Sequence, residues 1–77
     1  MTVNNAWIVP STINDCEVTL AIMVNRERGE FVVAFSRKGG SYGTAIYKSG
    51  LEYWLNGRYG FETETDAHCD AIERARS

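Results

Sequence analysis

Two runs of alternating apolar and polar residues, joined by a short glycine-containing segment, constrain the fold of this chain more than any other feature. The first run spans residues 16–24 and places on one face of an extended chain Val18, Leu20, Ile22 and Val24. This two-residue period predicts a β-strand. Residues 25–29 have the length and composition of a hairpin loop, in which Gly29 supplies a positive φ. A second strand is therefore expected to return antiparallel to the first.

The second run, residues 30–36, is apolar on both of its faces. Phe31, Val33 and Phe35 share one face, and Val32 and Ala34 lie on the other. A strand of a small antiparallel sheet usually has one polar face, because that face meets water. We therefore expect the second face to be covered by a helix, by another segment or by a partner, which includes a second copy of the chain in a homodimer.

Further segments complete the predicted sheet. Residues 6–9 form a short apolar run that Pro10 ends by removing a backbone donor, which indicates an edge strand. Residues 11–15 are predicted to form a polar loop. Residues 37–41 predict a second, glycine-rich turn, and residues 42–48 a third main strand.

Residues 49–57 are compatible with two structures. Ser49-Gly50-Leu51-Glu52 has the spacing of a helix capping box, and Gly57 would end a short helix. Asn56-Gly57 is instead a strong signal for a two-residue hairpin turn. We favour the hairpin, because aromatic residues, which are typical of strands, crowd both sides of this dipeptide.

The C-terminal segment predicts a helix. Thr63 or Thr65 would cap it, and its acidic first turn and basic last turn suit the helix dipole. Four apolar residues recur at helical spacing, namely Ala67, Ala71, Ile72 and Ala75. We expect the alanines to let the helix lie close to the sheet, with Ile72 as its main anchor.

Together these segments predict an α+β fold. It is a small two-layer domain, an antiparallel β-sheet of three to five strands with a C-terminal α-helix packed on one face. Residues 1–77 make a single domain, because a chain of 77 residues has no room for two. A domain of this size hides only about 60% of the surface that its unfolded chain exposes, so large catalytic clefts are not expected.

Charge is nearly balanced in total but uneven along the chain. Eight basic and ten acidic residues give a net charge of −2, which offers no global attraction to nucleic acid or to an anionic membrane. Residues 26–60 carry six basic and three acidic residues, whereas residues 61–77 carry two basic and five acidic ones. The sequence shows neither a secretory signal nor an apolar run near the ~20 residues of a membrane span. We therefore expect a cytoplasmic protein, in the host cytoplasm if a phage encodes it.

The sequence shows no enzymatic machinery. Catalysis needs a nucleophile or a metal with a base within hydrogen-bonding reach. His68 and Cys69 are neighbours on the predicted helix, where adjacent positions point about 100° apart. Cys16, His68, Cys69 and Asp70 lack the paired short spacings of a zinc site. We expect no enzyme activity, no cofactor and no metal. Cys16 and Cys69 could form one bridge, but without a secretory signal we expect reduced, mostly buried thiols.

The middle third of the chain combines aromatic with basic residues. Tyr, Trp and Arg are the residue types enriched at binding hot spots, and so small a domain cannot bury every ring. Some rings are expected on the surface, either as cross-strand pairs or as contacts for a partner. The predicted partner-binding residues are Arg37, Lys38, Tyr42, Tyr47, Tyr53, Trp54, Arg58 and Tyr59.

The junction between sheet and helix points to a second kind of partner. Gly60-Phe61-Glu62-Thr63, followed by Ala67 and Ala71 after three strands, resembles the end of the AP2-like DNA-binding domain of some phage-type integrases. In that family a three-stranded sheet enters the major groove and a C-terminal helix backs it. The resemblance implies that phosphates and bases are faced by Arg26, Arg28, Arg37, Lys38 and Lys48.

Two functions follow from these features. The first, favoured by the acidic net charge, is a small non-enzymatic protein-binding module that docks through an exposed Tyr/Trp/Arg-rich sheet surface. By analogy with small stand-alone chains of phages and mobile elements, it would inhibit host machinery, as anti-CRISPR proteins do. The alternative is a nucleic-acid-binding β-β-β-α domain that uses a basic hairpin ribbon. Its affinity would fall steeply with salt, whereas an aromatic protein interface would be much less sensitive.

Overall fold

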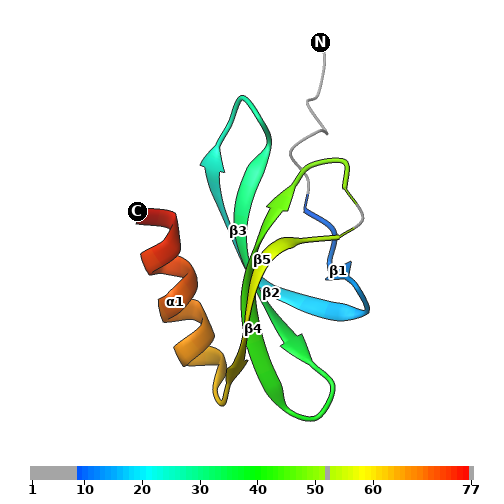
Figure 1. Ribbon diagram of the computed structural model, residues 1–77, viewed down its shortest axis with the longest axis vertical. Coiled ribbons are helices and arrows are strands. Elements are labelled where there is room, and N and C mark those ends of the chain that lie inside the picture. Colours follow the sequence, from blue (N-terminus) through cyan, green and yellow to red (C-terminus); the bar gives the residue numbers. More distant parts are fainter. Residues whose placement is uncertain (1–8, 52, 77) are drawn as a thin grey trace.

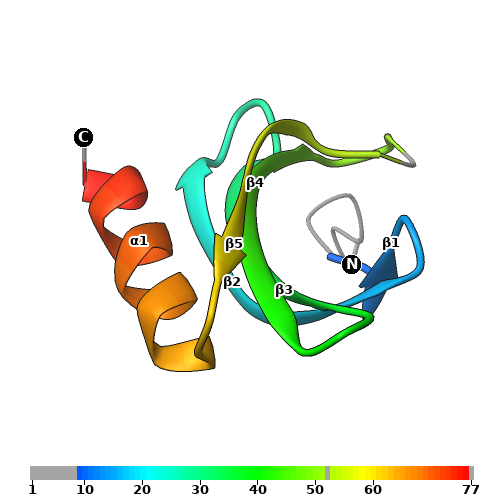
Figure 2. The same ribbon diagram turned by 60° about the horizontal axis from the view of Figure 1, so that its bottom comes forward.

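A computed structural model describes residues 9–51 and 53–76, which form a curled antiparallel sheet and one helix. The strands are β1 (Thr12–Ile13), β2 (Cys16–Asn25), β3 (Glu30–Arg37), β4 (Ser41–Lys48) and β5 (Leu55–Phe61), and the helix is α1 (Glu64–Arg76). Each strand pairs with the next along the chain, so that the sheet has the order β1-β2-β3-β4-β5 (Figure 1). The helix lies on the outer face of the curl, and β1 lies on the opposite side (Figure 2). The predicted α+β fold is confirmed.

The middle strand, β3, is buried on both of its faces. Phe31, Val33 and Phe35 point into the curl, where they form an inner cluster with Ile13, Ala45 and Tyr47. Val32 and Ala34 point outward and pack against Ala67 and Ala71 of α1. The helix is therefore what covers the apolar second face. Because α1 occupies that face, it is closed to a second copy of the chain.

Two bulges divide β2 between the faces of the sheet. Val18 stands opposite Phe35, but Leu20 stands opposite Ala34, so that Thr19 is an extra residue in the ladder. An extra residue reverses the alternation, and Val18 consequently joins the inner cluster while Leu20 packs on the helix side. A second irregularity follows Met23. The expectation that residues 18, 20, 22 and 24 share one face was therefore wrong.

The connections at the start of the sheet are tight turns. The predicted loop at residues 11–15 contains β1, which turns into β2 through Asn14 and Asp15 with φ of 52° and 62°. Two positive φ values in succession are the geometry of a type I′ hairpin, which Asn and Asp tolerate. The predicted loop after β2 is confirmed, with Gly29 at a φ of 64°. The edge strand predicted at residues 6–9 lies outside the described residues except for Val9, which packs against the inner cluster.

The segment after β4 forms neither the short helix nor the hairpin. A turn follows β4, in which the Leu51 amide donates to the Lys48 carbonyl at 3.1 Å, and β5 then runs unbroken from Leu55 to Phe61. Asn56 adopts a φ of 52° inside β5. Two residues of β5 separate Leu55 from Arg58, but only one residue of β4 separates their partners, Ile46 and Thr44. The positive φ that the Asn-Gly dipeptide favours therefore produces a bulge in β5. It does not produce a turn, because β5 pairs with β4 over a longer stretch than it could pair with itself as a hairpin.

The helix begins and ends as predicted but is anchored differently. The Thr63 hydroxyl accepts the Asp66 amide at 3.1 Å, which makes Thr63 the N-cap. Ala67 and Ala71 are 0% exposed, whereas Ile72 is 44% exposed and is not the anchor. With 13 residues, α1 falls short of a bilayer span, and the described part of the chain contains no helix that could cross one.

We expect opposite effects from two neighbouring substitutions in α1. Ala71→Leu should lower the free energy of unfolding by about 1–3 kcal/mol, because the close contact with Val32 and Ala34 leaves no room for a larger side chain. Ile72→Ala should change it by less than about 0.5 kcal/mol. Urea unfolding followed by circular dichroism measures both, and a larger loss for Ile72→Ala would contradict the assignment of the helix face.

Candidate docking surface

The eight predicted partner-binding residues separate into three groups. Tyr47 is buried in the inner cluster, at 3% exposed. Tyr42 and Arg58 lie on the helix side, where Tyr42 is half-buried against the cluster below α1. Of the rest, Arg37 and Trp54 each contact Tyr59. Tyr53 precedes Trp54 in the loop before β5, and Lys38 follows Arg37 in the turn after β3.

Three aromatic rings stack on the inner side of β5. Trp54 lies parallel to Phe35, with ring centroids 3.9 Å apart and planes inclined by 13°. The Trp54 Nε1 donates a hydrogen bond to the Tyr59 hydroxyl at 2.9 Å. Tyr59 meets Phe35 edge-on, with centroids 6.0 Å apart. Each such pair contributes about 0.5–1.5 kcal/mol beyond the apolar area that it buries, so the rings hold one another in place.

Two glycines provide the space for this stack. A Cβ at Gly43 would lie 2.6 Å from the Phe35 ring and 2.7 Å from the Arg58 carbonyl, so only glycine lets β5 lie this close to Phe35. A Cβ at Gly57 would collide with the Tyr59 hydroxyl. Sequence reasoning missed Phe35, because it lies in the core pattern of β3, and Gly57, because its dipeptide indicated a turn.

Arg37 adds a positive charge to the three stacked rings. Its guanidinium carbon lies 4.7 Å from the centroid of the Tyr59 ring, a cation–π contact. Tyr59 nevertheless remains 50% exposed and Tyr53 52% exposed. We call the surface formed by Arg37, Trp54 and Tyr59 the ring patch. Tyr53 lies next to Trp54 in the chain. Lys38 adjoins the ring patch, and both cations line a hollow of about 280 Å³ beside Cys16 and the Asn14-Asp15 turn.

Arg58 belongs to a separate polar network between sheet and helix. It donates to one carboxylate oxygen of Asp70 at 2.9 Å, and the fully buried Thr44 hydroxyl donates to the other at 2.6 Å. Arg74 donates to the Thr44 hydroxyl at 3.0 Å and to the carbonyl of Asn56 at 2.8 Å. The network therefore fastens α1 to β4 and also to the bulge in β5. Arg58 has a structural role here, and it is turned away from the ring patch.

Burial and the neighbouring charges shift the pKa of one basic group in this network. Burial is the main cause that lowers the pKa of Arg74, and the neighbouring Arg58 cation lowers it further, whereas Asp70 raises it. Asp70 thus offsets the repulsion between two guanidinium groups that reach the same helix-sheet junction.

The residues considered for catalysis or metal binding do not converge. His68 Nε2 is hydrogen-bonded to the Thr19 hydroxyl of β2 at 2.9 Å, while Cys69 is exposed on α1. Cys16 packs against the inner cluster on the other face of the sheet, and both thiols are free. The expectation of a buried Cys69 was wrong. Within residues 9–51 and 53–76, no three His, Cys, Asp or Glu side chains are placed to hold a metal ion.

Acidic side chains gather on the far side of β5 from the ring patch. A shallow groove of about 480 Å³ between the end of β5 and α1 is lined by Glu62, Asp66, Asp70 and Glu73, together with Cys69, Gly60 and Phe61. Four carboxylates therefore share this groove, whereas Arg37 and Lys38 line a separate hollow together with Asp15.

Comparison of the chain with known protein families, with curated proteins and with solved structures finds no match.

We expect Thr44→Val to lower the free energy of unfolding by about 1–3 kcal/mol. Valine keeps the shape of threonine but removes the hydroxyl that links Asp70 to Arg74. Thr65→Val, at an exposed position of α1, is the matched control and should change stability by less than about 0.5 kcal/mol. If urea unfolds the Thr44 variant and the unchanged chain at the same concentration, the hydroxyl does not hold the network together.

Proposed function

We propose that this protein is a non-enzymatic protein-binding module that docks through the ring patch. The observation that carries the proposal is the state of Tyr59, which is half-exposed and yet fixed by three neighbours, Trp54, Phe35 and Arg37. Exposed aromatic rings that are already ordered lose little conformational entropy when a partner covers them. Tyrosine, tryptophan and arginine together are also the composition of interface hot spots.

The charges around the ring patch favour a particular partner surface. Arg37 lies against the Tyr59 ring and shares a hollow with Lys38, and the carboxylates of Asp66, Asp70 and Glu73 line a groove elsewhere. A complementary protein surface would place an apolar side chain on Tyr59 and carboxylates near the two cations. Inhibition of host machinery remains a prediction from analogy that no observation on this chain tests.

The nucleic-acid alternative has less geometric support. An AP2-like mode needs an open sheet face that is rich in basic residues, opposite the helix. In this protein that face carries the inner cluster, with Val33 and Phe35 fully buried. Arg26 and Arg28 lie at one end of the hairpin and Arg37 and Lys38 at the other, so no continuous basic surface joins them.

The proposal is tested by capture from the source cell or its host, followed by affinity measurement with the purified partner. We expect Tyr59→Ala and Arg37→Ala each to weaken binding by at least ~10-fold, because truncation of a hot-spot residue removes about 2 kcal/mol or more and about 1.4 kcal/mol corresponds to tenfold. Gly57→Ala should weaken binding as well, since its Cβ would collide with the Tyr59 ring and displace it from Trp54 and Phe35.

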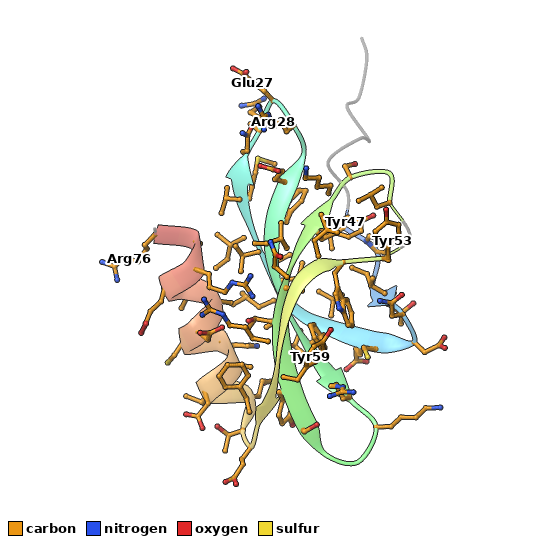
Figure 3. All side chains as sticks on the ribbon, in the orientation of Figure 1. Glu27, Arg28, Tyr47, Tyr53, Tyr59 and Arg76 are labelled. Carbon is orange, nitrogen blue, oxygen red and sulfur yellow. The ribbon has the colours of Figure 1, made fainter. Side chains whose placement is uncertain are left out.

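Arg76→Ala is the matched control for Arg37→Ala. Arg76 is exposed at the end of α1, on the opposite side of the molecule from Tyr53 and Tyr59 (Figure 3). Its loss should leave the affinity within about twofold. Equal binding by all four variants would refute docking through the ring patch, and a low-salt shift of generic duplex or single strands would support the nucleic-acid alternative instead.

A further inference from the structure

The edge of β2 is a second surface with unsatisfied binding capacity. The neighbouring strand β1 pairs with β2 only at Cys16 and Glu17, and Val18 donates to the Ser11 carbonyl. Among the described residues, no strand pairs with residues 20–25 on the side away from β3. The described strands therefore leave the backbone groups on that side of residues 20–25 outside the ladder, which is the arrangement to which a further strand can add.

Exposed apolar side chains flank this edge on both faces of the sheet. Met23 and Val24 are each 41% exposed, and Met23 stands opposite Phe31, which places it on the inner face. Ile72 is 44% exposed and follows His68 by one helical turn, so it shares the helix face that bonds to Thr19 of β2. Natural edge strands are protected by charges, proline or bulges; residues 18–25 contain no charge and no proline, and the irregularities after Val18 and Met23 are the protective features in this segment.

The ends of the edge carry opposite charges. Glu17 is exposed at the beginning of the strand, and the loop after its other end carries Arg26 and Arg28 against Glu27. This loop forms the tip of a hairpin that projects beyond α1, with Glu27 and Arg28 at its end (Figures 1 and 3). Antiparallel pairing of two identical edges brings the Glu17 end of each copy to the arginine end of the other.

We propose that two copies of this chain associate through residues 20–25 of β2, antiparallel about a two-fold axis, into one continuous sheet. The self-complementary charges select a second copy as the occupant of the edge, and Met23, Val24 and Ile72 supply the apolar contacts. A shallow groove of about 230 Å³ lined by Val9, Pro10, Ser11 and residues 18–21 lies at the start of the edge. This surface is distinct from the ring patch, so the dimer leaves the ring patch open.

Sedimentation equilibrium of the full chain tests the dimer. Six paired residues span only ~20 Å, so the interface is small and we expect association in the ~0.1–1 mM range. The mean mass should rise above 8.6 kDa toward twice that value as the concentration increases. A mass that stays at 8.6 kDa across this range would overturn the proposal.

Lysine substitutions beside the edge of β2 test whether this edge is the dimer interface. Met23→Lys and Ile72→Lys should each weaken dimerisation at least ~10-fold, because an edge lysine opposes strand pairing and both sites are exposed enough to keep the fold. Tyr53→Lys, the matched control, introduces a lysine at another exposed apolar side chain and should leave dimerisation intact. Circular dichroism confirms that each variant is folded. If neither edge variant weakens the dimer, or if Tyr53→Lys abolishes it, the edge of β2 is not the interface.

Charge reversal then tests the antiparallel arrangement. Glu17→Arg should weaken the dimer at least ~3-fold, since it places three arginines together at each end of the paired edge. Adding Arg26→Glu and Arg28→Glu to the same chain should restore association. Failure of the combined variant to recover would contradict the two-fold pairing.

Discussion

Burial of β3 on both faces is the constraint on which the structure depends. Phe31, Val33 and Phe35 require one apolar layer, and Val32 and Ala34 require another, so the strand can only be the middle of three layers of side chains. The curl of the sheet supplies the first layer, because it wraps β1 and Trp54 around the phenylalanines. The helix supplies the second. A chain of 77 residues thereby obtains two small cores instead of a single larger one.

Different interactions close the two cores. The inner cluster is sealed by ring stacking, in which Trp54 covers Phe35. The outer one is formed largely by small side chains, since Ala67 and Ala71 lie directly on Val32 and Ala34. Leu20, Tyr42, Ile46 and Phe61 pack around these small side chains, and the hydrogen bonds of Thr44, Asp70 and Arg74 add a polar attachment of the helix. These bonds also determine where Arg58 points.

The exposed apolar side chains fall into two groups with different chemistry. Tyr59 belongs to the ring patch and Tyr53 lies next to Trp54 in the chain; a cation and polar ring atoms there suit a partner of different composition. Met23, Val24 and Ile72 flank a strand edge, where backbone hydrogen bonds suit another strand. The carboxylates of α1 line a groove that includes no residue of either group. Three surfaces with separate properties thus fit on one small domain.

Local patterns in the sequence determined β3, β4, the hairpin loop after Asn25 and the capped helix, because two-residue and helical periods, Gly29 and Thr63 act through neighbours along the chain. The presence of rings at the surface was also foreseeable from their number. Tertiary structure alone decided what the Asn56-Gly57 dipeptide becomes, since a positive φ serves a turn or a bulge equally well and the pairing with β4 selects the bulge. It also decided that Tyr47 is buried while Tyr59 is exposed, and that Ile72 faces water while Ala71 does not. A bulge of one residue redirects every side chain that follows, and no local pattern records where a distant strand will impose it.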